Sequence, residues 1–183
     1  MDELLNYLNR DGLLLSNTVN VYPIVELIKE YYPNHLIYRD ISFTALFEEL
    51  NKRVPRAGKL NELLNGNKLT IIIDLSGMHE EPGGILSTNE NYKVLCSVLT
   101  TLMPVENLHI LVINTTYSVN VEGGTSNKSR GGGNLIHIFP MVLGFYDTIS
   151  VIKDREYDNF VDDKEICDSV KLLRGFKLKE ILR

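Results

Sequence analysis

The sequence has little cysteine, no excess of positive charge and no long apolar stretch. Its two cysteines, Cys96 and Cys167, cannot build a disulfide framework, and they fit a reducing intracellular compartment better. The formal net charge is -5 at pH 7, which excludes a generally basic coat, so any contact with nucleic acid must come from local patches. Apolar runs are only a few residues long, so no membrane span and no secretory leader are expected.

What is present is typical of a globular protein. Apolar residues make up 44% of the 183 residues and charged residues 23%, which excludes wholesale disorder and fibrous repeats. This length suits one domain, expected to cover residues 1–183.

Apolar patterns predict strands and helices in alternation. The run LTIIIDLSG (69–77) is typical of a strand buried on both faces. Residues 115–133 are expected to form a long loop, and the apolar segment 135–145 indicates no single element type. An α/β fold follows, with a mostly parallel central sheet flanked by helices and a C-terminal antiparallel hairpin. The predicted helices are 1–10, 24–32, 42–53 and 92–103, the predicted strands are 12–16, 35–41, 69–77 and 108–114, and the hairpin covers 147–154 and 164–173.

The segment after the first strand lacks a phosphate loop. Nucleotide-binding α/β proteins carry glycines, a lysine and a serine or threonine there. The equivalent segment of this chain, SNTVNVYPIVEL (16–27), has neither glycine nor lysine. We therefore expect no nucleotide cofactor and no nucleotide hydrolysis, because positioning of the phosphates supplies most of that chemistry.

Asp74 closes the apolar strand TIIID and has two interpretations. It is either a residual Walker B aspartate, the acidic partner of Mg²⁺, or an aspartate that caps the end of a buried strand. Without a phosphate loop, the capping role is favoured as the present one.

The order and spacing of segments across residues 12–175 resemble the RecA family, in particular the recombinases and recombinase paralogs of archaea and eukaryotes. TIIIDLSGM (70–78) resembles the Walker B strand and the serine after it. LHILVINTTYSV (108–119) resembles the strand that ends in an Asn-centred sensor motif, with Asn114 and Thr115 but no following glutamine. GGGNLIHIFP (131–140) is similar to the segment that closes the family's second DNA-binding loop.

The resemblance implies a single RecA-like domain without the N-terminal helical domain of full recombinases. Where the family carries a catalytic glutamate, RDISF (39–43) offers Ser42. Two lost catalytic features imply a non-enzymatic paralog, similar to the small subunits of Shu-type recombination accessory complexes. Such a protein would promote recombinase assembly in homologous recombination DNA repair in the nucleus. Its implied partners are another RecA-like paralog in a heterodimer or larger complex, a recombinase filament and DNA.

Two groups of residues are candidates for DNA contact. The first lies in 115–133, where the resemblance places the second DNA-binding loop and where small polar residues let phosphates approach; the alternative is a plain surface loop. The second is a basic stretch of four cations within eight residues, for which the alternative is a solvated helix end. If both groups lie on one face of the protein, they would form one continuous track for DNA contact. The first group is Asn127, Lys128, Ser129 and Arg130, and the second is Lys52, Arg53, Arg56 and Lys59.

Other interpretations stay open. An ATPase-dead RecA-fold subunit of a ring assembly acting on RNA, similar to those of the Elongator complex, would show the same losses and would prefer tRNA. A residual nucleotide-binding enzyme with an unorthodox loop is a third. No metal site is expected, since the spacing of His79, Glu80 and Glu81 fits no standard set of ligands. His137, in an apolar run, is expected to be a hydrogen-bonded core histidine.

Overall fold

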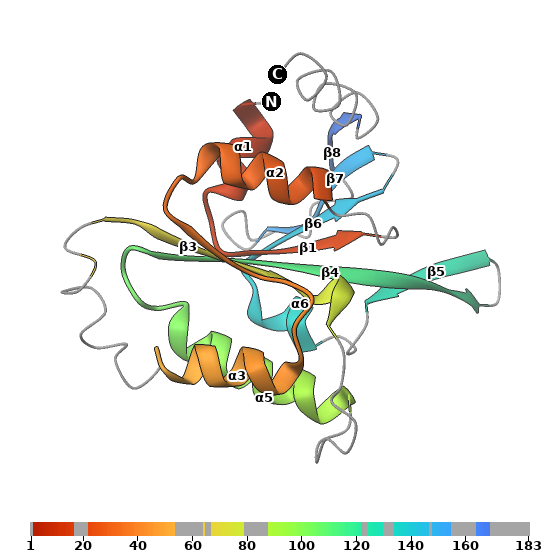
Figure 1. Ribbon diagram of the computed structural model, residues 1–183. Helices are drawn as coiled ribbons and strands as arrows, with labels where there is room; N and C mark the ends of the chain where they lie inside the picture. Colours follow the sequence, from red (N-terminus) through yellow and green to blue (C-terminus); the bar gives the residue numbers. More distant parts are fainter. Residues whose placement is uncertain are drawn as a thin grey trace.

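The computed structural model describes residues 2–16, 22–53, 64, 67–78, 88–121, 124–129, 134–146, 148–154 and 164–168, and the fold is that of these residues. Seven strands form one sheet in the order β2-β3-β4-β1-β6-β7-β8, and β5 pairs with β4 beside this path (Figure 1). The strands are β1 Gly12–Ser16, β2 His35–Tyr38, β3 Leu69–Asp74, β4 Leu108–Val121, β5 Gly124–Ser129, β6 Met141–Phe145, β7 Thr148–Asp154 and β8 Lys164–Asp168. The helices are α1 Asp2–Leu8, α2 Tyr22–Tyr31, α3 Phe43–Asn51, α5 Thr88–Leu102, α6 Asn134–Ile138 and the 3₁₀ turn η2 Leu75–Gly77.

The centre of the sheet is parallel and one side is antiparallel. β1 lies between β4 and β6 and is parallel to both. The pairs β2–β3 and β3–β4 are also parallel, whereas β6–β7 and β7–β8 are antiparallel. The prediction of an α/β fold with a mostly parallel sheet and a C-terminal antiparallel hairpin is confirmed.

The continuous apolar strands are divided between two hydrophobic cores. In β3, Ile71 and Ile73 face one core while Ile72 faces the other, and all three are fully buried. This follows from the two-residue period of a strand, which sends successive side chains to opposite faces. Helices α1 and α2 cover one face of the sheet, and α3, α5 and α6 cover the other (Figure 1). A strand that is apolar at every position is therefore buried on both sides.

Helix α3 shows how the sequence places a helix start. Ser42, in extended conformation, accepts a hydrogen bond from the backbone N–H of Ala45 at 3.2 Å and is the N-cap. Phe43, Leu46 and Leu50 then fall on one face and are buried, as the helical period requires.

The predicted long loop over 115–133 is wrong for most of its length. Strand β4 continues to Val121 and pairs antiparallel with β5, from Thr116 opposite Ser129 to Val121 opposite Gly124. We call residues 116–121 and 124–129 the ribbon. Figure 1 shows it projecting beyond the ends of the other strands. The glycines, serines and asparagines suggested a loop, but the β-branched Thr116, Val119 and Val121 favour extended chain.

The segment 135–145 contains two elements. Helix α6 comes first and strand β6 follows, parallel to β1. Leu135 and Phe139 are fully buried, whereas His137 is exposed on α6. The prediction of a core histidine at this position is therefore wrong, because the helical period turns His137 away from the sheet that its neighbours contact.

Candidate functional site

Three polar side chains lie on neighbouring strands at the carboxyl edge of the parallel sheet, where β1 and β3 end. The register sets Asp74 of β3 beside Ile113 of β4, and Ser16 of β1 beside Thr115. Asp74, Asn114 and Ser16 are all buried, with at most 2% of their surface exposed. Ligands of open α/β sheets bind beyond this edge, so what these side chains contact decides what the edge can hold.

Both carboxylate oxygens of Asp74 accept hydrogen bonds from other residues of the protein. Its Oδ2 accepts a hydrogen bond from Arg39 Nε at 2.7 Å, within an ion pair. Its Oδ1 accepts from the Ser76 backbone N–H at 3.0 Å and from the Ser76 hydroxyl at 2.6 Å. Asp74 is thereby the N-cap of η2. Arginine keeps its charge at every accessible pH, so a permanent internal cation lies where a residual Walker B aspartate would hold Mg²⁺.

Asn114 is also held by the protein. Its Oδ1 accepts from the Thr115 backbone N–H at 2.9 Å and from the Tyr92 hydroxyl of α5 at 3.4 Å. The Tyr92 ring packs against Phe43 of α3 with centroids 5.6 Å apart. Among the described residues, Thr115 Oγ1 is the one buried side-chain oxygen or nitrogen without a hydrogen-bond partner. The amide at the sensor-like position thus ties the strand end to two helices.

The ribbon carries three of the four residues predicted in the first DNA-contact group. Asn127, Lys128 and Ser129 lie on β5, opposite Ser118, Tyr117 and Thr116 in that order. Arg130 lies outside the described residues. Tyr117 is 49% exposed, and directly paired positions lie on the same face of an antiparallel pair. The register therefore places the Tyr117 and Lys128 positions side by side.

The second predicted group has local partners. Lys52 forms an ion pair with Glu49 one turn earlier in the chain. Arg53 Nε and Nη2 donate to the Tyr38 hydroxyl at 3.3 and 3.2 Å. Arg56 and Lys59 lie outside the described residues, as do His79, Glu80 and Glu81.

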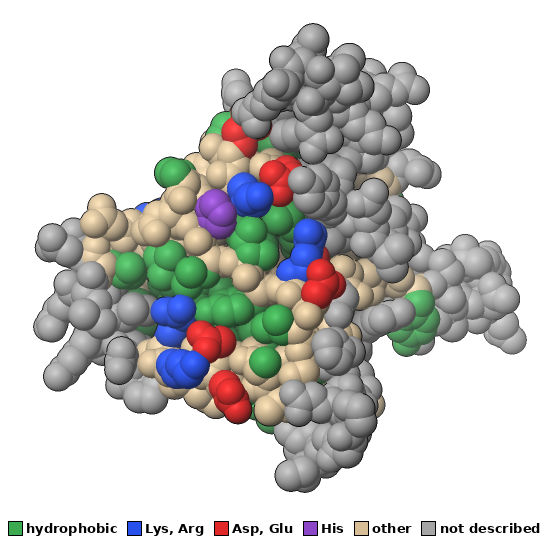
Figure 2. Space-filling model, in the orientation of Figure 1, with side chains coloured by type: hydrophobic (Ala, Val, Ile, Leu, Met, Phe, Trp, Pro, Cys, Tyr) green, Lys and Arg blue, Asp and Glu red, His purple; other side chains and the backbone are tan. Residues whose placement is uncertain are grey.

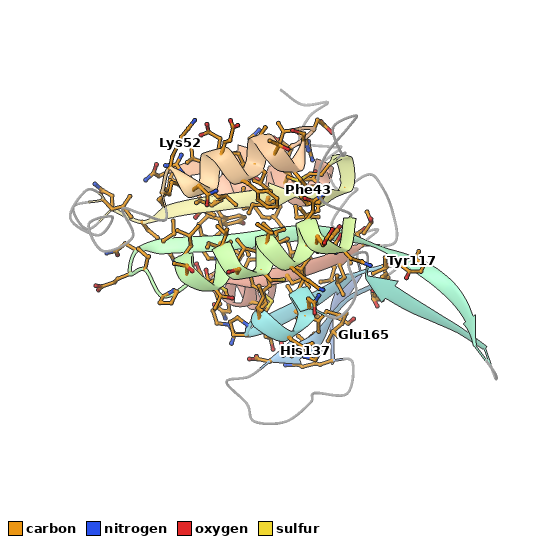
Figure 3. All side chains as sticks on the ribbon, turned by 90° about the horizontal axis from the view of Figure 1, so that it is seen from below. Phe43, Lys52, Tyr117, His137 and Glu165 are labelled. Atoms are coloured by element: carbon orange, nitrogen blue, oxygen red, sulfur yellow. The ribbon has the colours of Figure 1, made fainter. Side chains whose placement is uncertain are left out.

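Lys52 and the ribbon, which belong to the described parts of the two predicted groups, lie far apart. In Figure 3, Lys52 and Tyr117 are labelled at opposite ends of the molecule, because α3 runs back toward the amino edge while the ribbon extends from the carboxyl edge. Figure 2 shows acidic and basic side chains interspersed around a hydrophobic band on the described part of one face. That face carries no broad basic surface in its described part, in keeping with the net charge of -5.

A buried polar cluster at the amino edge was not predicted from the sequence. His109 of β4 is 2% exposed. Its Nε2 lies 2.9 Å from the Arg10 carbonyl and its Nδ1 3.2 Å from Thr70 Oγ1. A carbonyl only accepts, so Nε2 carries the hydrogen and Nδ1 accepts from the threonine hydroxyl. Burial lowers the pKa of His109 to about 4, and the imidazole is therefore neutral at pH 7.

Asp11 precedes β1 and belongs to the same cluster. Its Oδ1 accepts from the Ile110 backbone N–H at 2.6 Å, and burial raises the pKa of this carboxyl to about 6. The only sequence signal for either residue is a polar side chain next to a buried strand. The sequence does not indicate which residue Asp11 contacts, since Asp11 and Ile110 are 99 residues apart.

Comparison of the chain with protein-family models and with curated proteins gives no match to either. In the part of the chain that the structure describes, no three histidine, cysteine or acidic side chains gather in an arrangement suited to a metal ion. No helix in that part is both long enough and apolar enough to cross a membrane. The function is accordingly inferred from the geometry of the site.

Proposed function

We propose that this protein is a non-catalytic RecA-like subunit that binds DNA, pairs with a related paralog and promotes recombinase assembly in homologous recombination repair. The observation that carries the proposal is the ribbon, which projects from the carboxyl edge and pairs the exposed Tyr117 with Lys128. The RecA resemblance expects a DNA-binding segment at this place in the chain. Two further features, the state of Asp74 and the order of the strands, support it.

The ion pair at Asp74 supports a non-catalytic role. A divalent cation at Asp74 would displace Arg39, whose Nε lies 2.7 Å from Oδ2, and would leave a guanidinium without its carboxylate. Loss of this ion pair costs about 2–3 kcal/mol, less than for a fully buried pair because Arg39 is 27% exposed. Together with the absence of glycine and lysine in 16–27, this argues against metal-assisted phosphoryl transfer at this edge.

The order of the strands supports the RecA-like part of the proposal. β4, which carries Asn114, lies between β1 and β3. The sensor-like asparagine of β4 and the Walker-B-like aspartate of β3 thus lie on adjacent strands, and β4 also adjoins β1, which leads into segment 16–27. A nucleotide-binding ancestor of the RecA type would need these groups around one site.

The chemistry of the ribbon suits nucleic acid. Two-stranded ribbons enter DNA grooves, an exposed aromatic ring stacks on bases of a single strand, and lysine contacts phosphates. With a net charge of -5, the protein as a whole repels a polyanion. The affinity should therefore come from the ribbon and fall steeply with salt.

Fluorescence anisotropy tests the proposal. Labelled single-stranded DNA, forked DNA and tRNA are titrated across a salt series with the wild type, Tyr117→Ala and the double variant Lys128→Ala/Arg130→Ala. The matched control is Lys29→Ala/Lys93→Ala, which removes the same charge from helices α2 and α5. Each protein is measured alone and with any paralog that co-purifies.

We expect the ribbon variants to weaken DNA binding about fivefold or more while the control does not, since stacking alone contributes about 1–3 kcal/mol per base. The double variant should also reduce the salt slope by up to about 2. Equal binding by ribbon variants and wild type would refute the DNA interface. A clear preference for tRNA would favour the Elongator-like alternative. A stable monomer that pairs with no paralog, as judged by light scattering, would contradict the assembly role.

A further inference from the structure

A cavity of about 620 Å³ opens at the amino edge of the sheet, at the opposite end of the strands from the ribbon. It lies where α1 ends, where α2 turns into β2 and where the chain enters β3. The lining residues whose chemistry bears on a ligand are Asn9, Tyr31, Tyr32, Asn34, Asn67 and Lys68. Pockets for small molecules usually measure about 300–1,000 Å³, so the cavity has the size of a ligand site.

Two asparagine amides at the cavity lie close to internal hydrogen-bond partners. Asn34 Nδ2 donates to the Lys68 carbonyl at 3.0 Å, which leaves its Oδ1 as an acceptor. The Tyr32 hydroxyl lies 2.8 Å from the Leu8 carbonyl and 2.9 Å from Asn9 Oδ1, and its one hydrogen is donated to one of these two oxygens. The cavity wall therefore carries amide groups that can donate and accept hydrogen bonds.

The same wall holds an aromatic ring and a cation. Tyr31 is 43% exposed and lines the cavity, so part of its ring is accessible to a ligand. Lys68 is exposed and its Nζ lies 3.4 Å from the Asn9 carbonyl. None of the described residues that line the cavity is acidic, and the nearby His109 is neutral because burial lowers its pKa. Among the described lining residues Lys68 is therefore the charged side chain that a ligand meets, with Asp11 near enough to interact with it electrostatically.

We propose that this cavity binds a nucleotide, with the base stacked on Tyr31, the base edge hydrogen-bonded to the asparagine amides and the phosphate on Lys68. Amides that donate and accept together recognise base edges, tyrosine rings stack on bases, and a lysine ammonium attracts phosphate. A neutral sugar would leave Lys68 unused, and a simple anion would leave the ring and amides unused. The ligand is either a free mononucleotide or an unpaired nucleotide of a single strand.

This inference does not depend on the proposed function. The cavity lies at the opposite edge from the ribbon and shares no residue with it. It also differs from the site of a RecA-type nucleotide, which would lie beyond the carboxyl ends of the strands.

Nuclear magnetic resonance of the ¹⁵N-labelled full chain tests the site. AMP, GMP, CMP and UMP are titrated in turn, with the corresponding nucleosides and inorganic phosphate as separate arms. The readout is the shift of the asparagine side-chain NH₂ signals. Tyr31→Ala and Lys68→Ala are compared with Tyr117→Ala and Lys93→Ala, which remove a similarly exposed tyrosine and an exposed lysine elsewhere. Circular dichroism melting establishes that each variant is folded.

We expect at least one nucleotide to bind with a Kd of about 1 mM or below. Tyr31→Ala should weaken nucleotide binding by about five- to hundredfold. In Lys68→Ala, the nucleotide should bind with the same Kd as its nucleoside. Neither control should change the Kd. The inference is overturned if no nucleotide shifts the asparagine signals, or if binding survives Tyr31→Ala and Lys68→Ala unchanged.

A competition experiment separates the two sources of the ligand. A labelled single-stranded oligonucleotide is bound to the triple variant Tyr117→Ala/Lys128→Ala/Arg130→Ala, which lacks the ribbon residues proposed to contact DNA. The site would be assigned to unpaired nucleotides of a strand if two results are obtained. The mononucleotide would displace this oligonucleotide, and the oligonucleotide would no longer bind when Tyr31→Ala is added to the ribbon variant. Mononucleotide binding without oligonucleotide binding would assign it to the free nucleotide. If the ribbon does not bind DNA, the nucleotide titration and the competition experiment still test the cavity.

Discussion

Replacing Asp11 by asparagine should make the stability of this protein sensitive to acid, because Asp11 offsets the effect of a buried histidine. His109 and Asp11 lie in one cluster at the amino edge of the sheet, where burial lowers the pKa of the histidine and raises the pKa of the aspartate. Asparagine keeps an oxygen that can accept from the Ile110 N–H, which Asp11 Oδ1 binds at 2.6 Å. The substitution therefore removes the titration and keeps the hydrogen bond.

The histidine weakens the folded state in acid. Burial lowers the pKa of His109 from 6.5 to about 4, so between these values the unfolded chain binds a proton that the folded chain does not. Stability is then lost as the pH falls from 6.5 toward 4. One pKa unit corresponds to about 1.4 kcal/mol, which makes the loss about 3 kcal/mol. The side chain is 2% exposed, so solvent screening reduces this little.

The aspartate acts in the opposite sense. Burial raises the pKa of Asp11 from 3.8 to about 6, so between these values the folded chain binds a proton that the unfolded chain does not. Stability is then gained as the pH falls from 6 toward 3.8. Because Asp11 is partly exposed, we expect a gain of about 2 kcal/mol. In the wild type the two contributions largely cancel in the window between pH 4 and pH 6.

Urea unfolding followed by circular dichroism, from pH 7 down to pH 4, measures the effect. The chain has nine tyrosines and no tryptophan, so backbone ellipticity is the better signal. Relative to wild type, Asp11→Asn should lose about 2 kcal/mol between pH 7 and pH 4, and His109→Gln should gain about 3. Taking differences removes the contribution of the other carboxyl groups. If both variants follow the wild-type curve in parallel, the assigned burial of these groups is refuted. If His109→Gln does not fold, a ring-proton titration of His109 in wild type serves instead, with a midpoint well below 6.5 expected.

Three further substitutions probe the fold. Arg39→Ala should destabilise the protein by about 2–3 kcal/mol, less than a fully buried pair because Arg39 is 27% exposed; in a double-mutant cycle with Asp74→Asn, strictly additive effects would contradict the ion pair. Ser42→Ala should cost about 1 kcal/mol through loss of the α3 cap, whereas the exposed Thr44→Ala should cost about 0.5 kcal/mol or less, and equal losses would contradict the cap assignment. Ile72→Ala should cost about 2–5 kcal/mol against about 0.5 for the exposed Val94→Ala; a small loss at Ile72 would show that β3 is not a central strand.

The sequence alone predicted the elements whose apolar period is strong. The runs at 12–16 and 69–74 are strands because they are apolar at nearly every position, and 42–53 is a helix because its apolar residues recur once per turn behind Ser42. These are local effects of backbone geometry and of burying apolar surface. The absence of a phosphate loop was also visible, because a backbone cradle for phosphates needs glycines at known places.

Other features were beyond sequence reasoning because their partners lie far apart in the chain. The Arg39–Asp74 ion pair joins residues 35 positions apart, and the Asp11 contact to β4 spans 99. The ribbon was missed because a segment rich in glycine, serine and threonine becomes a strand only when a second such segment pairs with it. His137 was misplaced because a short apolar run does not by itself distinguish a helix from a strand.

The sequence by itself thus determined the fold class and the two-sided burial of the central strands, and it shows that segment 16–27 has neither glycine nor lysine, since each of these depends on residue type and spacing along one segment. Only the tertiary structure decided that Asp74 is paired with Arg39, that Tyr117 stands beside Lys128, and that asparagines from three separate segments line one cavity. The physical reason is that side-chain pairing depends on strand order and register. Those are chosen by the packing of the whole sheet against its helices.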